Sequence, residues 1–137
     1  MAALTASGVA NYRGEGKTYR LKMADDSTVF ANGMVMLNAG GLAVSAVADA
    51  SNTGVWGVAI GDYTNPAGGD VHCEVKTGEF RFVAVSIVQG NVGDVMYALD
   101  DQTFDETQLA NQPQCGKLSE FISATSGWVL IGPEFAS

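Results

Sequence analysis

His72 is the only histidine in the chain, and it directly precedes Cys73, one of two cysteines. An imidazole beside a thiol is the pair that a cysteine nucleophile uses, because the imidazole accepts the thiol proton. However, the segment from Val71 to Thr77 alternates apolar and polar residues, which predicts a half-buried strand. Neighbouring side chains on a strand point to opposite faces. We therefore interpret His72 as a surface histidine and Cys73 as a core residue, not as a base and its nucleophile.

Carboxylates gather in the second half of the chain, at Asp100, Asp101, Asp105 and Glu106. Two carboxylates can hydrolyse a glycosidic bond when burial raises the pKa of one of them. We interpret these residues as turn residues without an apolar surround, so no raised pKa is expected. A calcium site built from Asp100, Asp101, Gln102 and Asp105 is an alternative, but the segment lacks the spacing and the glycine of a calcium loop.

No other motif supplies catalytic chemistry. Gly90 and Gly93 are not followed by the Lys-Ser/Thr pair or the helix of a phosphate-binding loop. No serine lies in the Gly-x-Ser-x-Gly elbow of a hydrolase. A single histidine also excludes a metal site of several histidines. The sequence therefore predicts a protein that is not an enzyme and that needs no metal or cofactor.

Aromatic side chains offer an alternative based on binding. Tyr63, Trp56 and Trp128 would form a stacking platform for a sugar or a peptide if their rings were exposed. Aromatic residues in β proteins lie more often in the core or at a subunit interface. We keep a ligand-binding β-module, for example one that binds carbohydrate on a virion or cell surface, as the alternative function.

Composition predicts the elements that would position these residues. The 137 residues favour one domain, and 47% of them are apolar, which is enough for a core. Seventeen glycines are spread along the chain, between segments rich in valine, threonine and aromatic residues. Such spacing indicates many short strands joined by tight turns. We predict an all-β fold, a small antiparallel β-barrel or sandwich with glycine-rich turns and an extended N-terminal arm.

A repeat divides the chain into two halves. Gly33 and Gly93 each begin the pattern Gly-x-Val-Met, and each copy is followed by a second glycine-led strand, at Gly57 and at Gly116. We therefore predict a flexible arm at residues 1–17 and one β-domain of two related halves at residues 18–137.

Charge is distributed unevenly. Residues 1–22 hold four basic residues and one acidic residue, a net of +3, whereas residues 23–137 hold three basic and fourteen acidic residues, a net of −11. An acidic body argues against nucleic acid as a partner, because phosphate neutralisation needs a basic footprint. A basic arm on an acidic body can instead contact an acidic protein surface. The alternative is that these basic residues only solvate an edge strand.

The segment from Phe80 to Val88 is apolar on both faces. A strand of this kind either lies between two layers or is covered by a neighbouring subunit. We expect a subunit interface here, and its candidate residues are Phe80, Phe82, Val83, Val85 and Ile87.

Nothing in the sequence indicates secretion or membrane insertion. Residues 1–10 carry no basic residue and no long apolar run, so we predict no signal peptide. No segment approaches the roughly 20 apolar residues of a membrane helix. Cys73 and Cys115 are accordingly predicted to be separate, reduced thiols.

An ordered series of motifs resembles the small head-decoration, or capsid cement, proteins of tailed bacteriophages, over roughly residues 28–132. The best match is Val92-Gly93-Asp94-Val95-Met96-Tyr97, which is similar to the family's Gly-Asp-x-Val-Tyr. Three features depart from the family pattern: Met34 where many relatives have aspartate, the basic arm from Tyr12 to Lys22, and the long loop from Asp101 to Gln114. The other matching segments are Asn32-Gly33-Met34-Val35-Met36, Gly54-Val55-Trp56-Gly57-Val58-Ala59, Val71 to Val75 with Gly78-Glu79-Phe80, Cys115-Gly116-Lys117-Leu118 and Trp128-Val129-Leu130-Ile131.

The resemblance implies a virion structural protein, made in the host cytoplasm, that binds the outer surface of the expanded capsid. Its expected partner is the major capsid protein, whose subunits it would bridge, commonly as a homotrimer. Neither nucleic acid nor membrane is an expected partner. The side chains expected to contact the capsid are Tyr12, Arg13, Lys17, Arg20 and Lys22.

Overall fold

The computed structural model describes residues 3–4, 12–13, 16–48 and 54–133. Strands make up 52% of it, and the described part contains no α-helix, which confirms the predicted all-β class. The strands are β1 (Tyr12–Arg13), β2 (Thr18–Lys22), β3 (Ser27–Val29), β4 (Met34–Leu37), β5 (Ala43–Ser45), β6 (Val55–Ala59), β7 (Tyr63–Asn65), β8 (His72–Lys76), β9 (Gly78–Ala84), β10 (Val95–Ala98), β11 (Thr103–Asp105), β12 (Gln114–Ser123) and β13 (Ser126–Ile131), with one 3-10 turn, η1 (Gln89–Asn91).

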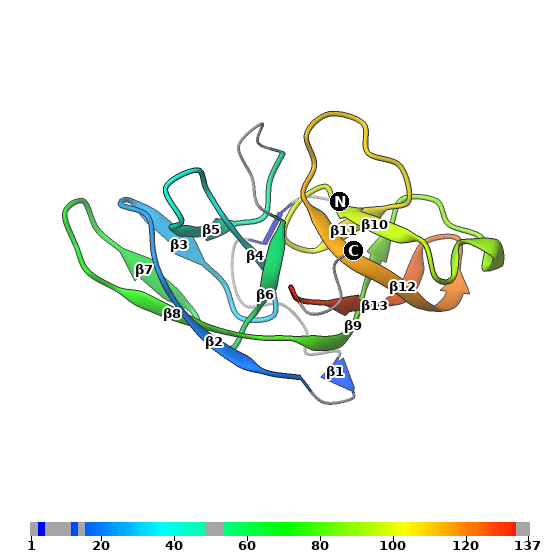
Figure 1. The fold of residues 1–137 in the computed structure, drawn as a ribbon, viewed down its shortest axis with the longest axis horizontal. Coiled ribbons are helices and arrows are strands. Elements are labelled where there is room, and N and C mark those ends of the chain that lie inside the picture. The colour runs from blue at the N-terminus through cyan, green and yellow to red at the C-terminus, as the bar shows by residue number, and fades with distance from the viewer. Residues whose placement is uncertain (1–2, 5–11, 14–15, 49–53, 134–137) are drawn as a thin grey trace.

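Two sheets share one topology. The first sheet has the order β2-β8-β6-β4-β5, and the second has the order β9-β13-β12-β10-β11. In each sheet the first strand along the chain pairs with the last, and the second and third form a hairpin. Figure 1 shows the two sheets side by side, with β8 continuing almost directly into β9 from one to the other. We call them the first and the second barrel.

Each barrel is closed by parallel pairing. In the second barrel β9 pairs with β11, with Ala84 opposite Phe104. In the first barrel the same closure is one parallel bridge between Met23 and Ala43, supported by a hydrogen bond from Ala24 N–H to the Ala43 carbonyl at 3.1 Å. The second barrel is therefore closed along a strand pair, and the first only at a single point.

Register shows how closely the barrels correspond. Val35 lies opposite Gly57, and a β-bulge follows Val35. Met96 lies opposite Gly116, and a β-bulge follows Met96. Val35 and Met96 are thus equivalent, and both are fully buried. The Gly-x-Val-Met repeat read from the sequence is out of this register by one residue, since it aligns Met36 with Met96.

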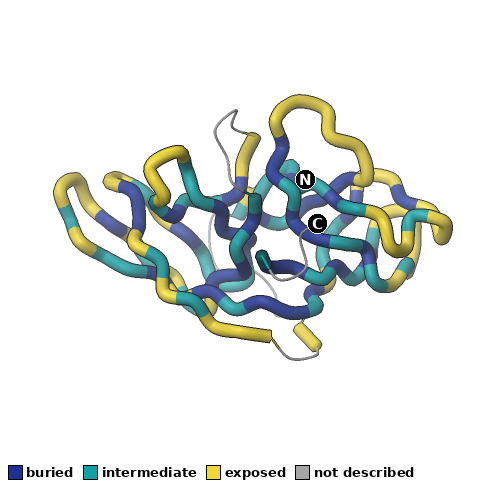
Figure 2. The backbone as a smooth tube through the Cα atoms, viewed as in Figure 1, coloured by how far each residue is buried: buried dark blue, intermediate teal, exposed yellow. Residues whose placement is uncertain are grey.

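Buried residues lie along the strands of both barrels and where the barrels meet, and exposed residues lie mostly in the turns (Figure 2). One core cluster lies within the first barrel. The other fills the second barrel and includes Met34, Val55 and Val58 of the first, so side chains of both halves pack together. Of the predicted N-terminal arm, residues 1–2, 5–11 and 14–15 lie outside the described residues.

Candidate functional site

Strand β2 presents a basic outer face. Thr18, Arg20 and Lys22 are exposed, whereas Tyr19 and Leu21 are half-buried and pack against the core of the first barrel. This alternation is what a strand with one face on the core produces. It brings two of the predicted capsid-binding cations, Arg20 and Lys22, onto one face.

The cations of this face have few acidic partners. Among the described residues, neither Arg20 nor Lys17, which is also exposed, forms an ion pair. Lys22 Nζ lies 3.8 Å from Asp70 Oδ1, and both side chains are largely exposed. Exposed pairs of this kind contribute little to stability, so Lys22 remains available to a partner. We call Lys17, Arg20 and Lys22 the basic face.

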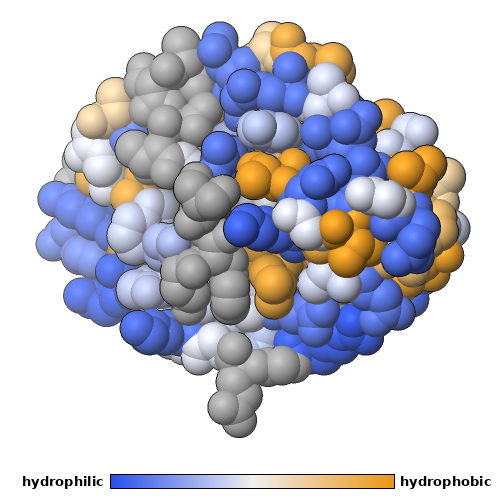
Figure 3. All heavy atoms as spheres, turned by 45° about the vertical axis from the view of Figure 1, so that its right-hand side comes forward, coloured by the Kyte–Doolittle hydropathy of each residue, from blue (hydrophilic) through white to orange (hydrophobic). Residues whose placement is uncertain are grey.

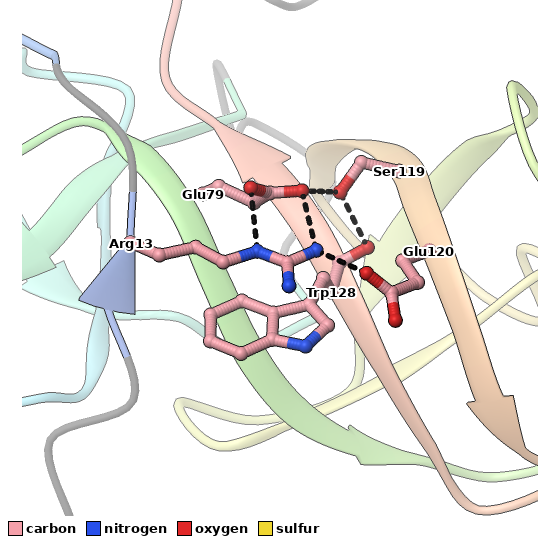
Figure 4. Close-up of polar contacts among 5 residues, drawn as sticks. All are labelled: Arg13, Glu79, Ser119, Glu120 and Trp128. Atoms are coloured by element: carbon pink, nitrogen blue, oxygen red, sulfur yellow. Dashed lines mark hydrogen bonds and ion pairs between the residues drawn. The ribbon is translucent and has the colours of Figure 1, made fainter.

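Arg13 is engaged within the chain. Its guanidinium donates to both carboxylate oxygens of Glu79, at 2.8 and 3.2 Å, and also to Glu120. It lies 4.0 Å from the centroid of the Trp128 ring (Figure 4). Ser119 Oγ is within hydrogen-bond distance of the Glu79 carboxylate and of the Trp128 carbonyl oxygen. Arg13 was expected to contact a capsid, but two carboxylates already neutralise its charge.

Charge pairing changes the proton affinities of this cluster. The hydrogen bond from Arg13, supported by one from Ser119, holds the pKa of Glu79 below its usual range, although partial burial opposes the effect. The two carboxylates in turn raise the pKa of Arg13. The pairing therefore keeps both groups charged.

Tyr12 is docked in the same way. It lies in β1, which pairs with β9, and its ring centroid is 4.8 Å from that of Phe80. Lys76 Nζ lies 4.0 Å from the Tyr12 ring, and the Tyr12 hydroxyl donates to the Thr77 carbonyl at 3.4 Å. We call Tyr12 and Arg13 of β1, which are bound to β9, the clasp. The clasp holds the described part of the predicted arm against the second barrel.

The expected subunit-interface residues divide between core and surface. Phe80 and Ile87 are 3% and 1% exposed and belong to the core of the second barrel. Both are therefore unavailable to a neighbouring subunit in the folded chain. Phe82 and Val83 are partly buried, while Val85 is 49% exposed. The apolar character of one face is thus explained by packing between layers within the chain.

Val85 belongs to a group of exposed aliphatic side chains. Ala84 and Ile87 donate backbone hydrogen bonds to Thr125 and Ala124, which holds the segment after β9 against the β12–β13 turn. Figure 3 shows this side of the molecule, where hydrophobic residues are interspersed with polar ones. We call the group the apolar tip, and its members are Val85, Val88, Val92 and Ile122.

Asp101 corrects one expectation about the carboxylates. Its side chain is 2% exposed, and burial raises its pKa, with Asp100 adding to the effect. The carboxylate accepts a hydrogen bond from Leu4 N–H at 2.8 Å, and the Asp101 carbonyl accepts one from Met34 N–H at 2.8 Å. The prediction of a solvated turn residue was therefore wrong for Asp101, whose contacts join three segments of the chain. It was also wrong for Asp105, which is buried at the end of strand β11.

The other candidate chemical groups do not converge. His72 is half-buried and Cys73 is fully buried, as expected for neighbours on opposite faces of a strand. Cys73 and Cys115 are free, and burial raises the pKa of their thiols to about 11 and about 12. Within the described residues no group of three or more potential ligands could hold a metal ion.

Sequence reasoning missed three partners of Arg13, which are Glu79, Glu120 and Trp128, and it missed Ser119, which bonds to Glu79. Glu79 and Glu120 lie 66 and 107 residues from Arg13 in the sequence. No local motif connects positions so far apart, so only the fold brings them together.

No helix in the described part of the chain is long and apolar enough to cross a membrane. Comparisons with protein-family models, curated proteins and solved structures found no match.

Proposed function

We propose that this chain is a non-enzymatic virion protein that binds the outer surface of an expanded phage capsid and stabilises it by bridging major capsid subunits. The observation that carries the proposal is the separation of charge. Lys17, Arg20 and Lys22 are exposed together on a molecule with a net charge of −8. Complementary charge orients a protein on its partner and accelerates association.

A bridging protein needs more than one contact surface. The basic face lies on the first barrel, and the apolar tip lies at one end of the second. In this proposal the basic face contacts the shell, and the tip, which contains Val85, forms the contact between protomers of a trimer. The acidic remainder keeps the protein soluble at the high copy number of a virion component. Many copies that bind only the assembled shell stabilise it by mass action.

Co-sedimentation tests this function. The purified chain would be mixed with undecorated expanded heads and with unexpanded proheads of the source phage. We expect saturable binding to expanded heads alone, because the proposed site is assembled when the shell expands. Failure to bind either particle would contradict the proposal.

No observation favours carbohydrate binding to the same extent. Tyr63, Trp56 and Trp128 are each partly buried, and Arg13 covers one face of the Trp128 ring. The Trp56 ring contacts the Tyr19 ring edge-on, at a centroid distance of 5.5 Å. A sugar platform needs an open ring face, and at Trp128 one face is already occupied.

A further inference from the structure

Strand β2 has one edge that pairs with no strand of the described residues. Thr77 N–H donates to the Lys17 carbonyl, and Met23 N–H donates to the Val71 carbonyl, so both ends of β2 are bonded to the β8 side. Hydrogen-bonding direction alternates along an antiparallel strand. The backbone groups of Thr18, Arg20 and Lys22 therefore point away from β8. Within the described residues, the only pairing on that side is the Met23–Ala43 bridge beyond the end of β2.

In the second barrel, the edge equivalent to that of β2 belongs to β9. Ala59, Val75 and Tyr19 lie side by side across β6, β8 and β2. Leu118, Val129 and Phe80 make the same row across β12, β13 and β9. Tyr19 is therefore the equivalent of Phe80.

Phe80 and Glu79 carry an added strand. β1 pairs with them antiparallel, with Tyr12 opposite Phe80 and Arg13 opposite Glu79. The second barrel thus has an extended segment bound at a position where the described part of the first barrel has none. The same backbone geometry at Thr18 and Tyr19 is suited to a strand in that place.

The charges beside the β2 edge indicate which kind of segment can pair with it. On β9 the added strand brings Arg13 to Glu79 and Glu120. The residue of β2 equivalent to Glu79 is Thr18, which carries no charge and lies opposite Lys76 of β8. The basic residues Lys17, Arg20 and Lys22 outnumber the carboxylates beside them, Glu74 opposite Arg20 and Asp70 near Lys22. A second copy of β1 would place its arginine beside cations of the same sign. An acidic segment fits this edge.

We propose that the free edge of β2 binds an extended, acidic segment of the shell subunit as an additional β-strand. Main-chain hydrogen bonds to Thr18, Arg20 and Lys22 give affinity in such strand addition, and the basic side chains select acidic residues. This inference rests on the proposed function and specifies how the basic face engages the shell.

Hydrogen exchange tests the pairing directly. In the full chain on expanded heads, mass spectrometry should show slowed exchange in residues 17–23, relative to the free protein. The Asn38–Leu42 turn, which lies outside the proposed contact, is the internal reference. Unchanged exchange in residues 17–23 on heads that are saturated with the protein would overturn strand addition.

A matched pair of variants separates the backbone from the charge. Arg20→Gln removes only the charge, whereas Arg20→Pro also removes an N–H that points to the free edge. Proline is tolerated at such edge positions. We expect Arg20→Pro to bind expanded heads about tenfold or more weakly than Arg20→Gln. Equal binding by the two folded variants would overturn strand addition and leave charge alone as the contact.

These experiments distinguish a failure of the proposed function from a failure of strand addition alone. If the unmodified chain does not bind expanded heads, the proposed function and this inference both fail. If it binds but residues 17–23 are not protected, only strand addition fails. If Arg20→Pro does not fold, hydrogen exchange on the unmodified chain still decides the question.

Discussion

Arg20 in β2 and Arg81 in β9 occupy equivalent positions of the two barrels. Each follows directly after an equivalent aromatic residue, Tyr19 or Phe80, and each is exposed. Their surroundings differ. Arg20 lies opposite Glu74 of β8 and between Lys17 and Lys22 along the chain, whereas Arg81 lies opposite Trp128, donates to Ser126 Oγ at 3.0 Å and follows Glu79 by two residues. The repeated fold therefore places two arginines at the same strand position with different neighbours.

Charge reversal at these two positions should have unequal effects. We expect Arg20→Glu to weaken binding to expanded heads by about tenfold, because it places a negative charge in the basic face. Arg81→Glu makes the same change at the equivalent strand position and should leave binding unchanged. Co-sedimentation at matched protein concentrations measures both. Equal losses would show that net charge, not the basic face, governs the contact.

Removing Arg13 should open the clasp. Arg13→Ala deletes the ion pairs to Glu79 and Glu120 and uncovers one face of Trp128. We expect acrylamide to quench tryptophan fluorescence more strongly in this variant, with the fold retained. Lys22→Ala removes an exposed cation from the first barrel, where it lies opposite His72 and not opposite a tryptophan, and it serves as the control. Unchanged quenching in Arg13→Ala would argue against the clasp.

Acid should weaken the ion pair between Arg13 and Glu79. The pKa of Glu79 is lowered in the folded chain from an ordinary value of 4.5, chiefly by the Arg13 hydrogen bond. A lowered pKa means that the stabilisation is present above pH 4.5 and is lost as the pH falls below it.

Glu79→Gln provides the comparison for this pH effect. At pH 7 it should unfold a few degrees below the unmodified chain, a small shift because the pair is partly exposed. The difference should shrink as the pH falls below 4.5. Comparing the two chains cancels the opposite contribution of Asp101, whose raised pKa favours stability at low pH. A difference in unfolding temperature that stays constant from pH 7 to pH 3 would contradict this assignment.

The buried thiols should be almost unreactive in the folded chain. At pH 8, raising a thiol pKa from 9.0 to about 11 lowers the thiolate fraction about a hundredfold, and the thiolate is the reactive species. Cys115, with a pKa of about 12, should react more slowly still. Labelling with a disulfide reagent should modify both thiols only after denaturation. Rapid labelling of the native chain would show that one barrel opens locally.

The sequence predicts local features of this fold better than its long-range contacts. Alternation identifies β2 and β8 because one face of each packs on a core. It does not identify the partner of Arg13, since Glu120 is 107 residues away. The two-sided apolar strand at Phe80 suggested a subunit contact, yet a sequence does not show whether a covering layer belongs to the same chain.

The repeat also shows that strand register depends on contacts that the sequence does not reveal. The glycine pattern identified two related segments, but it placed Gly33 and Gly93 in register, one residue away from the correspondence of Val35 with Met96. The bulges and the strand pairing set that correspondence. Asp101 lies between polar neighbours in the sequence, and its burial arises from contacts with Leu4 and Met34, which are distant in the chain.

The glycines opposite Val35 and Met96 give a quantitative test of the two barrels. A Cβ on Gly116 would lie 1.6 Å from the Leu130 carbonyl oxygen, and its φ of +149° is one that residues with a side chain rarely adopt. A Cβ on Gly57 would lie 2.9 Å from the Lys76 carbonyl oxygen, without an unusual φ. We expect Gly57→Ala to lower the free energy of unfolding by about 1–3 kcal/mol, as overpacking does.

Gly116→Ala should cost about 3 kcal/mol or more, because backbone strain is added to a clash with main chain. Urea unfolding of the two variants measures the difference. Residues 114–117 lie in β12, which pairs with β10 on one side and with β13 on the other. The backbone around Gly116 therefore has little room to shift and relieve the clash. If Gly116→Ala were as stable as Gly57→Ala, the close approach of β12 to β13 at Leu130 would be wrong.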